Sequence, residues 1–388
     1  MSRSSRAEQR AASPRLPATF HDWLGAANAA THRTLGRDLH YTYDGQSALY
    51  QAFSALRTAR GGRVLVPAYH CPTVIEPILR AGFAVDYYDV LPDLRRPART
   101  FSELLTDAHA ALVVINYFGF EFDLSSLPER DTDNGLILVE DCCHSFLQGN
   151  GTDLSGTRGD IAIYSFKKLV PCYTGGAIRY NRADVPRTPA ARRVSLPHQY
   201  AHARQVLVDS RDNCAWSLAR APEPAPPREP LGGPITQPPL AEAYPFPEDC
   251  VDSTMPPLAR RILARSDLRA CASIRRAHYR TIAACLAEVE ALVQPLPDID
   301  AQTCPWGYPL LLADRAATDY QLKNLGVPFF TFGEQLHPTL RAVVGDFPHA
   351  ADLSRRLLFL ATHQGLSTAQ VEHFCAAIVG FFAGTKRG

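Results

Sequence analysis

The chain has 388 residues, 46% of them hydrophobic and 20% charged, with a formal net charge of +1 at pH 7. That length allows about two to three domains, or one large α/β domain with a smaller attachment. The balanced charge argues against a nucleic-acid or membrane-surface partner, and no apolar run approaches the roughly 20 residues that span a bilayer, so a small-molecule partner is favoured. Ten cysteines without a secretory signal predict reduced thiols in a cytoplasmic protein.

The first 17 residues predict a disordered leader. They hold four arginines and one glutamate among Ser, Ala and Pro, which offers too little apolar surface to offset ordering. The Arg and Ser content also fits a transit peptide, although no clear amphipathic stripe is present.

Residues 18–220 predict a large α/β domain. Short apolar runs alternate there with helical periodicity, and several runs are apolar on both faces, which is typical of buried parallel strands. Helices are expected at Ser47 to Arg60 and Val74 to Leu79. The expected strands are Arg63 to Pro67, Phe83 to Tyr88, Ala111 to Ile115, Leu136 to Val139 and Ile161 to Tyr164. The fold class is therefore α/β with a mostly parallel sheet.

A proline-rich break separates this part from the rest. Residues 221–250 are rich in proline and predict a long loop, either a surface insertion or an active-site lid. Residues 251–388 predict a smaller α+β domain. Its expected elements are helical structure over Leu258 to Val293, a strand at Tyr308 to Leu312, and helices near Ala316 to Leu325 and Thr368 to Phe382.

Two polar segments should meet at the carboxyl ends of the parallel strands, where ligands bind in such sheets. Asp44-Gly45-Gln46-Ser47 opens a helix, whose free N–H groups suit a phosphate, although an ordinary N-cap has the same residues. Asp141, after a buried strand, needs a cation or donors, and a protonated pyridine nitrogen is one candidate. Cys142, Cys143 and His144 also permit a zinc site, but adjacent cysteines lack the usual ligand spacing. His144 alone equally fits a hydrogen-bonded core residue.

Lysine is scarce in this chain, with four against thirty-six arginines, yet two of them are adjacent at Lys167 and Lys168. A lysine amine can form a Schiff base with an aldehyde, which arginine cannot do. Ser165, three residues before Lys168, adds a hydroxyl for a phosphate beside that amine. The plainer interpretation is a surface lysine pair. Lys167 remains a rival for the same role, although strand alternation points neighbours to opposite faces.

These segments occur in an order that resembles the DegT/StrS family of fold-type-I, pyridoxal-phosphate-dependent aminotransferases, best known for aminating keto-sugar nucleotides. The resemblance runs from about Tyr41 to the C-terminus. The matched segments are Asp44 to Leu49, Val66 to Tyr69, Asn116 to Gly119, Glu140 to His144, Gly159 to Gly176, Leu353 to Leu360 and His363-Gln364.

The resemblance implies a role for each matched residue. Lys168 falls on the Schiff-base lysine, Asp141 on the partner of the pyridinium nitrogen, and His144 on the residue near the phenolic oxygen. It further implies pyridoxal 5'-phosphate as cofactor, an amino donor such as glutamate, a keto acceptor, and a homodimer with shared active sites, without a metal. The remaining cofactor contacts implied are Gly45, Gln46, Ser47 and Ser165 at the phosphate and Tyr69 over the ring.

Some positions depart from the family pattern. Relatives have His or Asn shortly before the lysine and an acidic residue before the double glycine, where this chain has Phe166-Lys167 and Thr174. The proline-rich stretch replaces a loop that carries an Asn contributed by the partner subunit. Two alternatives therefore stay open: a pyridoxal enzyme with a non-sugar substrate or a reaction such as dehydration, and a non-catalytic regulator on the same fold.

Overall fold

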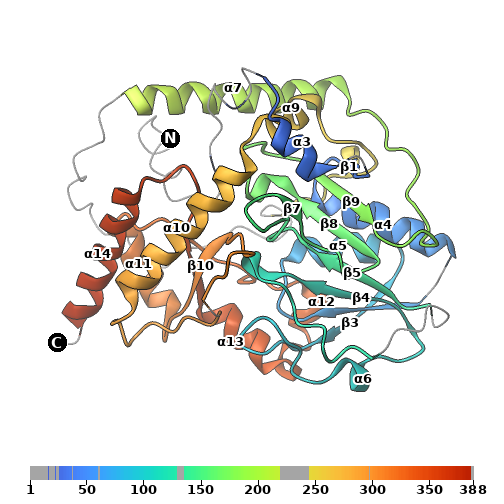
Figure 1. The fold of residues 1–388 in the computed structure, drawn as a ribbon. Coiled ribbons are helices and arrows are strands. Elements are labelled where there is room, and N and C mark those ends of the chain that lie inside the picture. Colours follow the sequence, from blue (N-terminus) through green and yellow to red (C-terminus); the bar gives the residue numbers. More distant parts are fainter. Residues whose placement is uncertain are drawn as a thin grey trace.

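The computed structural model describes residues 16, 22, 26–36, 38–59, 62–128, 135–218, 244–296 and 298–385. Their main feature is a seven-stranded sheet in the order β1-β9-β8-β5-β4-β2-β3 (Figure 1). Its strands are β1 (His40–Thr42), β2 (Arg63–Pro67), β3 (Ala84–Tyr88), β4 (His109–Ile115), β5 (Ile137–Asp141), β8 (Ile161–Ser165) and β9 (Gly176–Tyr180).

Five of these strands run parallel. β2 pairs with β3 and β4, β4 with β5, and β5 with β8, all in parallel, whereas β9 is antiparallel to both β8 and β1. The prediction of a mostly parallel α/β sheet is confirmed. Of the predicted strands, β2 has the expected bounds, and the other four differ at their ends by one or two residues.

The helices beside the sheet begin where the sequence provides caps. α4 (Gly45–Ala59) follows Asp44, whose Oδ1 accepts the backbone N–H of Ser47 at 2.9 Å, and α5 (Pro72–Arg80) has proline in its first turn. α4 packs on α5, β8 and β9. The shorter elements of this part are α3 (Ala29–Leu35), α6 (Phe101–Leu104) and the hairpin of β6 (Leu147–Gln148) and β7 (Asp153–Leu154).

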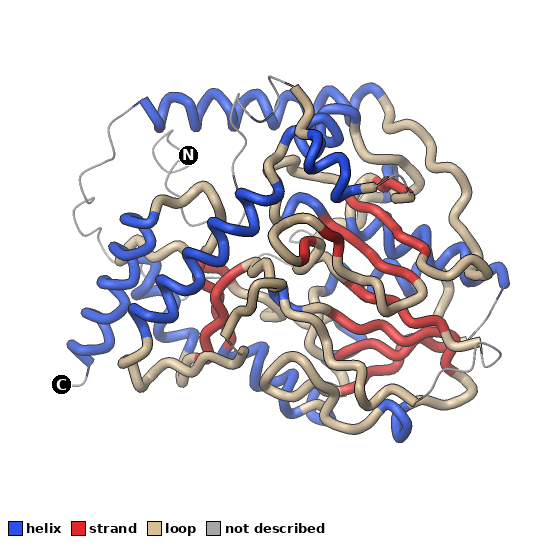
Figure 2. The backbone as a smooth tube through the Cα atoms, viewed as in Figure 1, coloured by secondary structure: helices blue, strands red, loops and turns tan. Residues whose placement is uncertain are grey.

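The C-terminal part contains an antiparallel sheet in the order β10-β12-β11, separate from the large sheet (Figure 2). Its strands are β10 (Gly307–Leu311), β11 (Phe329–Phe330) and β12 (Leu357–Ala361). The helical stretch predicted from Leu258 to Val293 is two helices, α9 (Pro257–Arg265) and α10 (Leu268–Leu286), because Asp267 caps a new helix through the N–H of Ala270. The other helices are α11 (Arg315–Asn324), α12 (Pro338–Arg341), α13 (Pro348–Arg356) and α14 (Thr368–Thr385).

One hydrophobic core joins the two sheets. Buried residues of the large sheet, such as Val66 and Leu112, belong to the same cluster as Leu310 and Phe359 of the small one. The predicted domain boundaries stay predictions. The predicted leader and most of the proline-rich segment lie outside the described residues. A long helix that the sequence did not predict, α7 (Leu196–Leu218), runs across the top of Figure 1. No described helix combines the length and apolarity needed to cross a membrane.

Candidate active site

The ends of four neighbouring strands form one edge of the large sheet. In the register of the sheet, Gly176 at the start of β9 lies between Ser165, the last residue of β8, and Thr42, the last residue of β1. Asp141 ends β5 and pairs with Ile163 of β8. The predicted acid, serine and lysine segments are therefore brought together at the carboxyl ends of the parallel strands, as expected for such a sheet.

Lys168 lies at the end of a short turn that follows β8. The turn, Phe166–Lys168, is held by the N–H of Phe166, which donates to the carbonyl of Gly175 at 2.9 Å. The Lys168 side chain is half-buried, and its Nζ lies 4.9 Å from the centre of the Trp306 ring. Within the described part of the chain it makes no hydrogen bond or ion pair. Because this amine is partly shielded from water and has no carboxylate partner, it is available to bind a ligand group.

The two adjacent lysines have different neighbours. The charge of Lys168 lowers the pKa of His144, and it opposes the rise that burial causes in the pKa of the Cys143 thiol. The charge of Lys167 instead opposes the rise that burial causes in the pKa of the Cys172 thiol. Lys168, rather than Lys167, therefore lies beside the residues that follow β5.

Asp141 and its neighbour Glu140 are both buried but differently satisfied. Glu140 is fully covered, and its carboxylate accepts the N–H groups of Arg158 and Gly159, which makes it a structural acid. Asp141 is 4% exposed, and its Oδ1 accepts the N–H of Cys143 at 2.9 Å. Among described residues Asp141 has no ion-pair partner, not even Lys168. Because an ionised buried carboxylate costs several kcal/mol unless it is paired, Asp141 is suited to bind a cationic ligand group.

His144 lies within a cluster of aromatic rings. Its ring stacks on Trp306 with centroids 4.2 Å apart and on Phe118 at 5.1 Å. Phe118 has a left-handed backbone with φ of 57°, which is strained for a bulky residue and often marks a functional site. Burial, followed by the charge of Lys168, holds the pKa of His144 well below its ordinary value, so the ring is neutral. Its Nδ1 is buried without a hydrogen-bond partner.

The residues predicted to contact the phosphate, Gly45, Gln46, Ser47 and Ser165, lie at the start of α4 and the end of β8. A Cβ added to Gly45 would lie 3.2 Å from both the Cys143 Sγ and the Ser165 Cβ, so a larger residue at the start of α4 would require these side chains to shift slightly. The Ser47 N–H and hydroxyl both donate to Asp44 Oδ1, at 2.9 and 3.0 Å. The Gln46 amide donates to the carbonyl of Pro245 at 3.1 Å, and its Oε1 is buried without a partner.

Tyr69, predicted over the cofactor ring, is fully buried. Its hydroxyl donates to the carbonyl of Phe332 at 2.7 Å, and its ring packs against Tyr117 and Phe332. The structure thus shows Tyr69 as part of the aromatic packing, with no contact to Lys168 or Asp141 among its described interactions.

Trp306 is the main site residue that the sequence did not reveal. It precedes β10 in the C-terminal part, yet it contacts both His144 and the amine of Lys168, and its indole N–H is buried without a partner. Nothing near Trp306 in the sequence indicates this contact, because it depends on how the two sheets pack.

The residues fit a pyridoxal phosphate molecule. Near the carboxyl ends of β5 and β8 lie, among the described residues, an amine without an ion-pair partner, a carboxylate without a cation, a histidine with an unpartnered Nδ1, and the start of α4 at Gly45. These groups match an aldehyde, a protonated ring nitrogen, a ring hydroxyl and a phosphate, respectively. The alternative zinc site is not supported by a ligand cluster, since no described group of three or more His, Cys, Asp or Glu residues is arranged to hold a metal.

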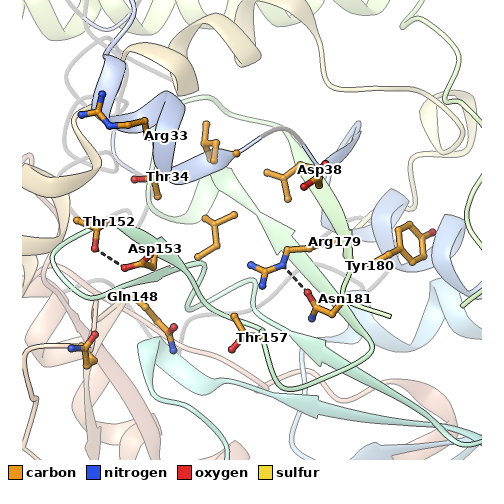
Figure 3. A pocket seen from close by; sticks show the side chains of 15 residues that line it. Arg33, Thr34, Asp38, Gln148, Thr152, Asp153, Thr157, Arg179, Tyr180 and Asn181 are labelled. Atoms are coloured by element: carbon orange, nitrogen blue, oxygen red, sulfur yellow. Dashed lines mark hydrogen bonds between the residues drawn. The ribbon is translucent and has the colours of Figure 1, made fainter. Parts of the chain in front are cut away.

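A separate polar hollow of about 690 Å³ lies at the other end of β9 (Figure 3). Arg179 lines it and donates to Asn181 at 2.7 Å, and Arg33 and Asp38 are also among the lining residues. Tyr180, also in its lining, pairs with Ile161 at the start of β8, so this hollow is remote from the carboxyl ends of the strands. It contains none of the predicted site residues.

Comparison with known proteins agrees with this geometry. Residues 40–188 match the DegT/DnrJ/EryC1/StrS aminotransferase family, which confirms over that segment the resemblance predicted from the sequence. GDP-perosamine synthase of Vibrio cholerae is 25% identical over 141 residues, which are 36% of this chain and 38% of that protein. UDP-N-acetyl-3-dehydro-alpha-D-glucosamine 3-aminotransferase of Acidithiobacillus ferrooxidans is 29% identical over 150 residues, 37% of this chain and 40% of that protein. The chain thus matches about two fifths of the length of these relatives.

The likeness of fold extends over nearly the whole chain. The PMP-form of the putative sugar aminotransferase Spr1654 from Streptococcus pneumoniae superposes with a TM-score of 0.62 at 14% identity, covering 99% of this chain and 97% of that one. The fold-type-I prediction is confirmed.

Proposed function

We propose that this chain is a pyridoxal-phosphate-dependent aminotransferase, in which Lys168 is the lysine that forms a Schiff base with the cofactor. The observation that supports this most is an amine and a carboxylate from neighbouring strands that do not pair with each other. Asp141 ends β5 and Lys168 lies in the turn after the adjacent strand β8, yet the two side chains form no ion pair. A ligand that offers an aldehyde to the amine and a cationic nitrogen to the carboxylate satisfies both at once.

Each part of the cofactor has a candidate partner. Lys168 would bind the aldehyde carbon, Asp141 the ring nitrogen, and His144 the ring oxygen. The phosphate would lie at the N-terminus of α4, with Gly45 and Ser165 among the residues that hold it. When bound, pyridoxal phosphate supplies an electron sink for the charge left on a substrate carbon.

The protein's own contribution is proton transfer and exclusion of water. As a free amine, Lys168 Nζ takes the proton from the α-carbon of the amino donor and returns a proton when the acceptor is aminated, which contributes on the order of a hundred- to ten-thousand-fold. The Asp141 carboxylate would stabilise the protonated form of the ring nitrogen. The neutral His144 ring, with Phe118 and Trp306 against it, would keep water from the space beside the Lys168 amine.

The substrates are proposed from the relatives. Their names describe enzymes that form amino sugars of nucleotides, which supports a keto-sugar nucleotide as acceptor. L-glutamate is proposed as donor from the family resemblance. We also propose a homodimer with shared active sites that acts in the cytoplasm. Nine described cysteines, all unpaired, fit a reducing compartment.

The test is a visible absorbance spectrum of the protein with pyridoxal phosphate, recorded for the wild type, Lys168→Ala and Lys167→Ala. We expect a band at the violet edge that only Lys168→Ala loses and that L-glutamate shifts to shorter wavelength. A band that glutamate leaves unchanged would instead support another donor or another pyridoxal reaction. No band in the wild type would contradict the enzyme proposal and favour a non-catalytic regulator.

A further inference from the structure

The turn that carries Lys168 is tied to the C-terminal part of the chain. Leu169 follows the lysine directly, and its carbonyl accepts a hydrogen bond from the Gln364 Nε2 at 2.8 Å. The Cys271 Sγ lies 3.6 Å from the same oxygen. The peptide next to the lysine is therefore held by two residues that lie more than a hundred positions later in the sequence.

Gln364 connects this peptide to a buried arginine. Its Oε1 accepts the Nε–H of Arg275 at 2.9 Å. Because a guanidinium only donates and the Leu169 carbonyl only accepts, one orientation of the Gln364 amide satisfies both neighbours, and the structure has that orientation. Gln364 thus works as a two-sided connector between Arg275 and Leu169.

Arg275 also holds the aromatic partner of the lysine. Its side chain is 0% exposed, and its NH1 donates to the carbonyl oxygens of Trp306 and Pro305 at 3.1 and 3.4 Å. Among the described residues it forms no ion pair with a carboxylate. One guanidinium therefore fixes both the Trp306 backbone and, through Gln364, the peptide that follows Lys168.

We propose that Arg275 and Gln364 are positioning residues, which set the Lys168 amine against the Trp306 ring through the Leu169 carbonyl. The importance of that position for catalysis rests on the proposed function, whereas the mechanical link does not. A loss of the link should release the amine from the ring and from the half-buried site, even in protein without cofactor.

The decisive variant is Gln364→Glu. A glutamate keeps an acceptor for Arg275 but has no donor for the Leu169 carbonyl. If Gln364 only satisfies the arginine, this variant behaves as the wild type; if it positions the lysine, the amine is released although the arginine stays paired. Gln294→Leu is the matched control, because Gln294 also donates to one group, the Tyr279 hydroxyl, and accepts from another, the Leu296 N–H, in the C-terminal part.

The measurement is limited acetylation of the cofactor-free protein with an N-hydroxysuccinimide ester, read by tandem mass spectrometry as the ratio of Lys168 to Lys323. Lys323 is an exposed lysine on α11 and serves as internal reference. We expect the ratio to rise about five-fold in Gln364→Glu, which corresponds to about 1 kcal/mol of lost hydrogen bonding at 1.36 kcal/mol per ten-fold. Gln364→Leu should raise it at least as much, and Gln294→Leu should leave it unchanged.

A wild-type ratio in Gln364→Glu, or an equal rise in Gln294→Leu, overturns the proposal. Unfolding midpoints of each variant confirm that labelling reports the folded state. Since the ratio is measured without pyridoxal phosphate, failure of the cofactor band and failure of the positioning link give different results.

Discussion

Replacing Gly176 by alanine should disrupt the edge of the sheet where the site is built. A Cβ at this position would meet the carbonyl group of Asp44 at a separation that real Cβ atoms do not show, and it would lie 2.8 Å from the Thr42 Oγ1. The Asp44 carbonyl cannot easily withdraw, because it accepts the Thr42 hydroxyl at 2.9 Å and the Ala48 N–H at 3.0 Å. Gly176 is itself paired to strands on both sides.

The magnitude follows from two opposing contributions. Insertion of a methyl group into a packed site costs about 1–3 kcal/mol, and the upper end applies where the neighbour is backbone. Replacing glycine also lowers the entropy of the unfolded chain, which stabilises the folded state by about 0.4–1 kcal/mol. We expect Gly176→Ala to lower the free energy of unfolding by about 2 kcal/mol, and to weaken pyridoxal phosphate binding because Asp44 and Gly45 are displaced together.

Urea unfolding followed by circular dichroism measures the first effect, provided that the slope with urea is unchanged. Gly345→Ala is the control, since nothing lies within 4 Å of its added Cβ. It should be as stable as the wild type or slightly more so. If Gly176→Ala is as stable as Gly345→Ala, the steric argument for this edge is refuted.

Two further predictions concern charge. Burial lowers the pKa of the fully buried His70 to about 4, so the unfolded chain binds more protons as the pH falls from about 6.5 towards 4, and stability is lost in that window. Between about pH 7.5 and pH 5, the free energy of unfolding of His70→Gln should therefore fall by about 2 kcal/mol less than that of the wild type, as measured by urea titrations. An equal fall in both proteins would contradict this assignment. Asp44→Asn keeps the helix cap but removes a negative charge beside the proposed phosphate, so it should tighten pyridoxal phosphate binding up to about ten-fold and leave pyridoxal binding unchanged, as measured by absorbance titration. An equal change for both ligands would show that the charge of Asp44 does not act on a phosphate.

The sequence predicted the local elements of the large sheet well, because buried parallel strands have continuous apolar runs. β2 was predicted with its observed bounds, and the segments that hold Asp141 and Lys168 followed their strands as expected. β1 was missed because three residues of mixed polarity carry almost no periodic signal. β12 is a five-residue apolar run, which periodicity alone does not separate from a buried helix.

The contacts between segments that are distant in the sequence could not be predicted, for a different reason. Trp306 and Gln364 act on Lys168 only through the packing of the two sheets, and no local pattern encodes which residues of one sheet meet the other. The missed contacts are therefore those between the two sheets, whereas Asp141 and Lys168 could be located at strand ends from the sequence, and their chemical roles stay a prediction. The role predicted for Tyr69 over the cofactor ring stays a prediction, and its hydroxyl and ring are both engaged in packing.

The dependence of the Lys168 turn on Gln364 has a consequence for synthesis. Ribosomes add about 5–20 residues per second, so the roughly 200 residues between the lysine and its anchor take about 10–40 s to appear. During that whole interval the nascent chain carries Lys168 without Gln364, and for more than half of it also without Arg275 and Trp306. The amine reaches its final surroundings only after Gln364 has been made, so the nascent large sheet passes through a stage in which the lysine is present but not yet fixed.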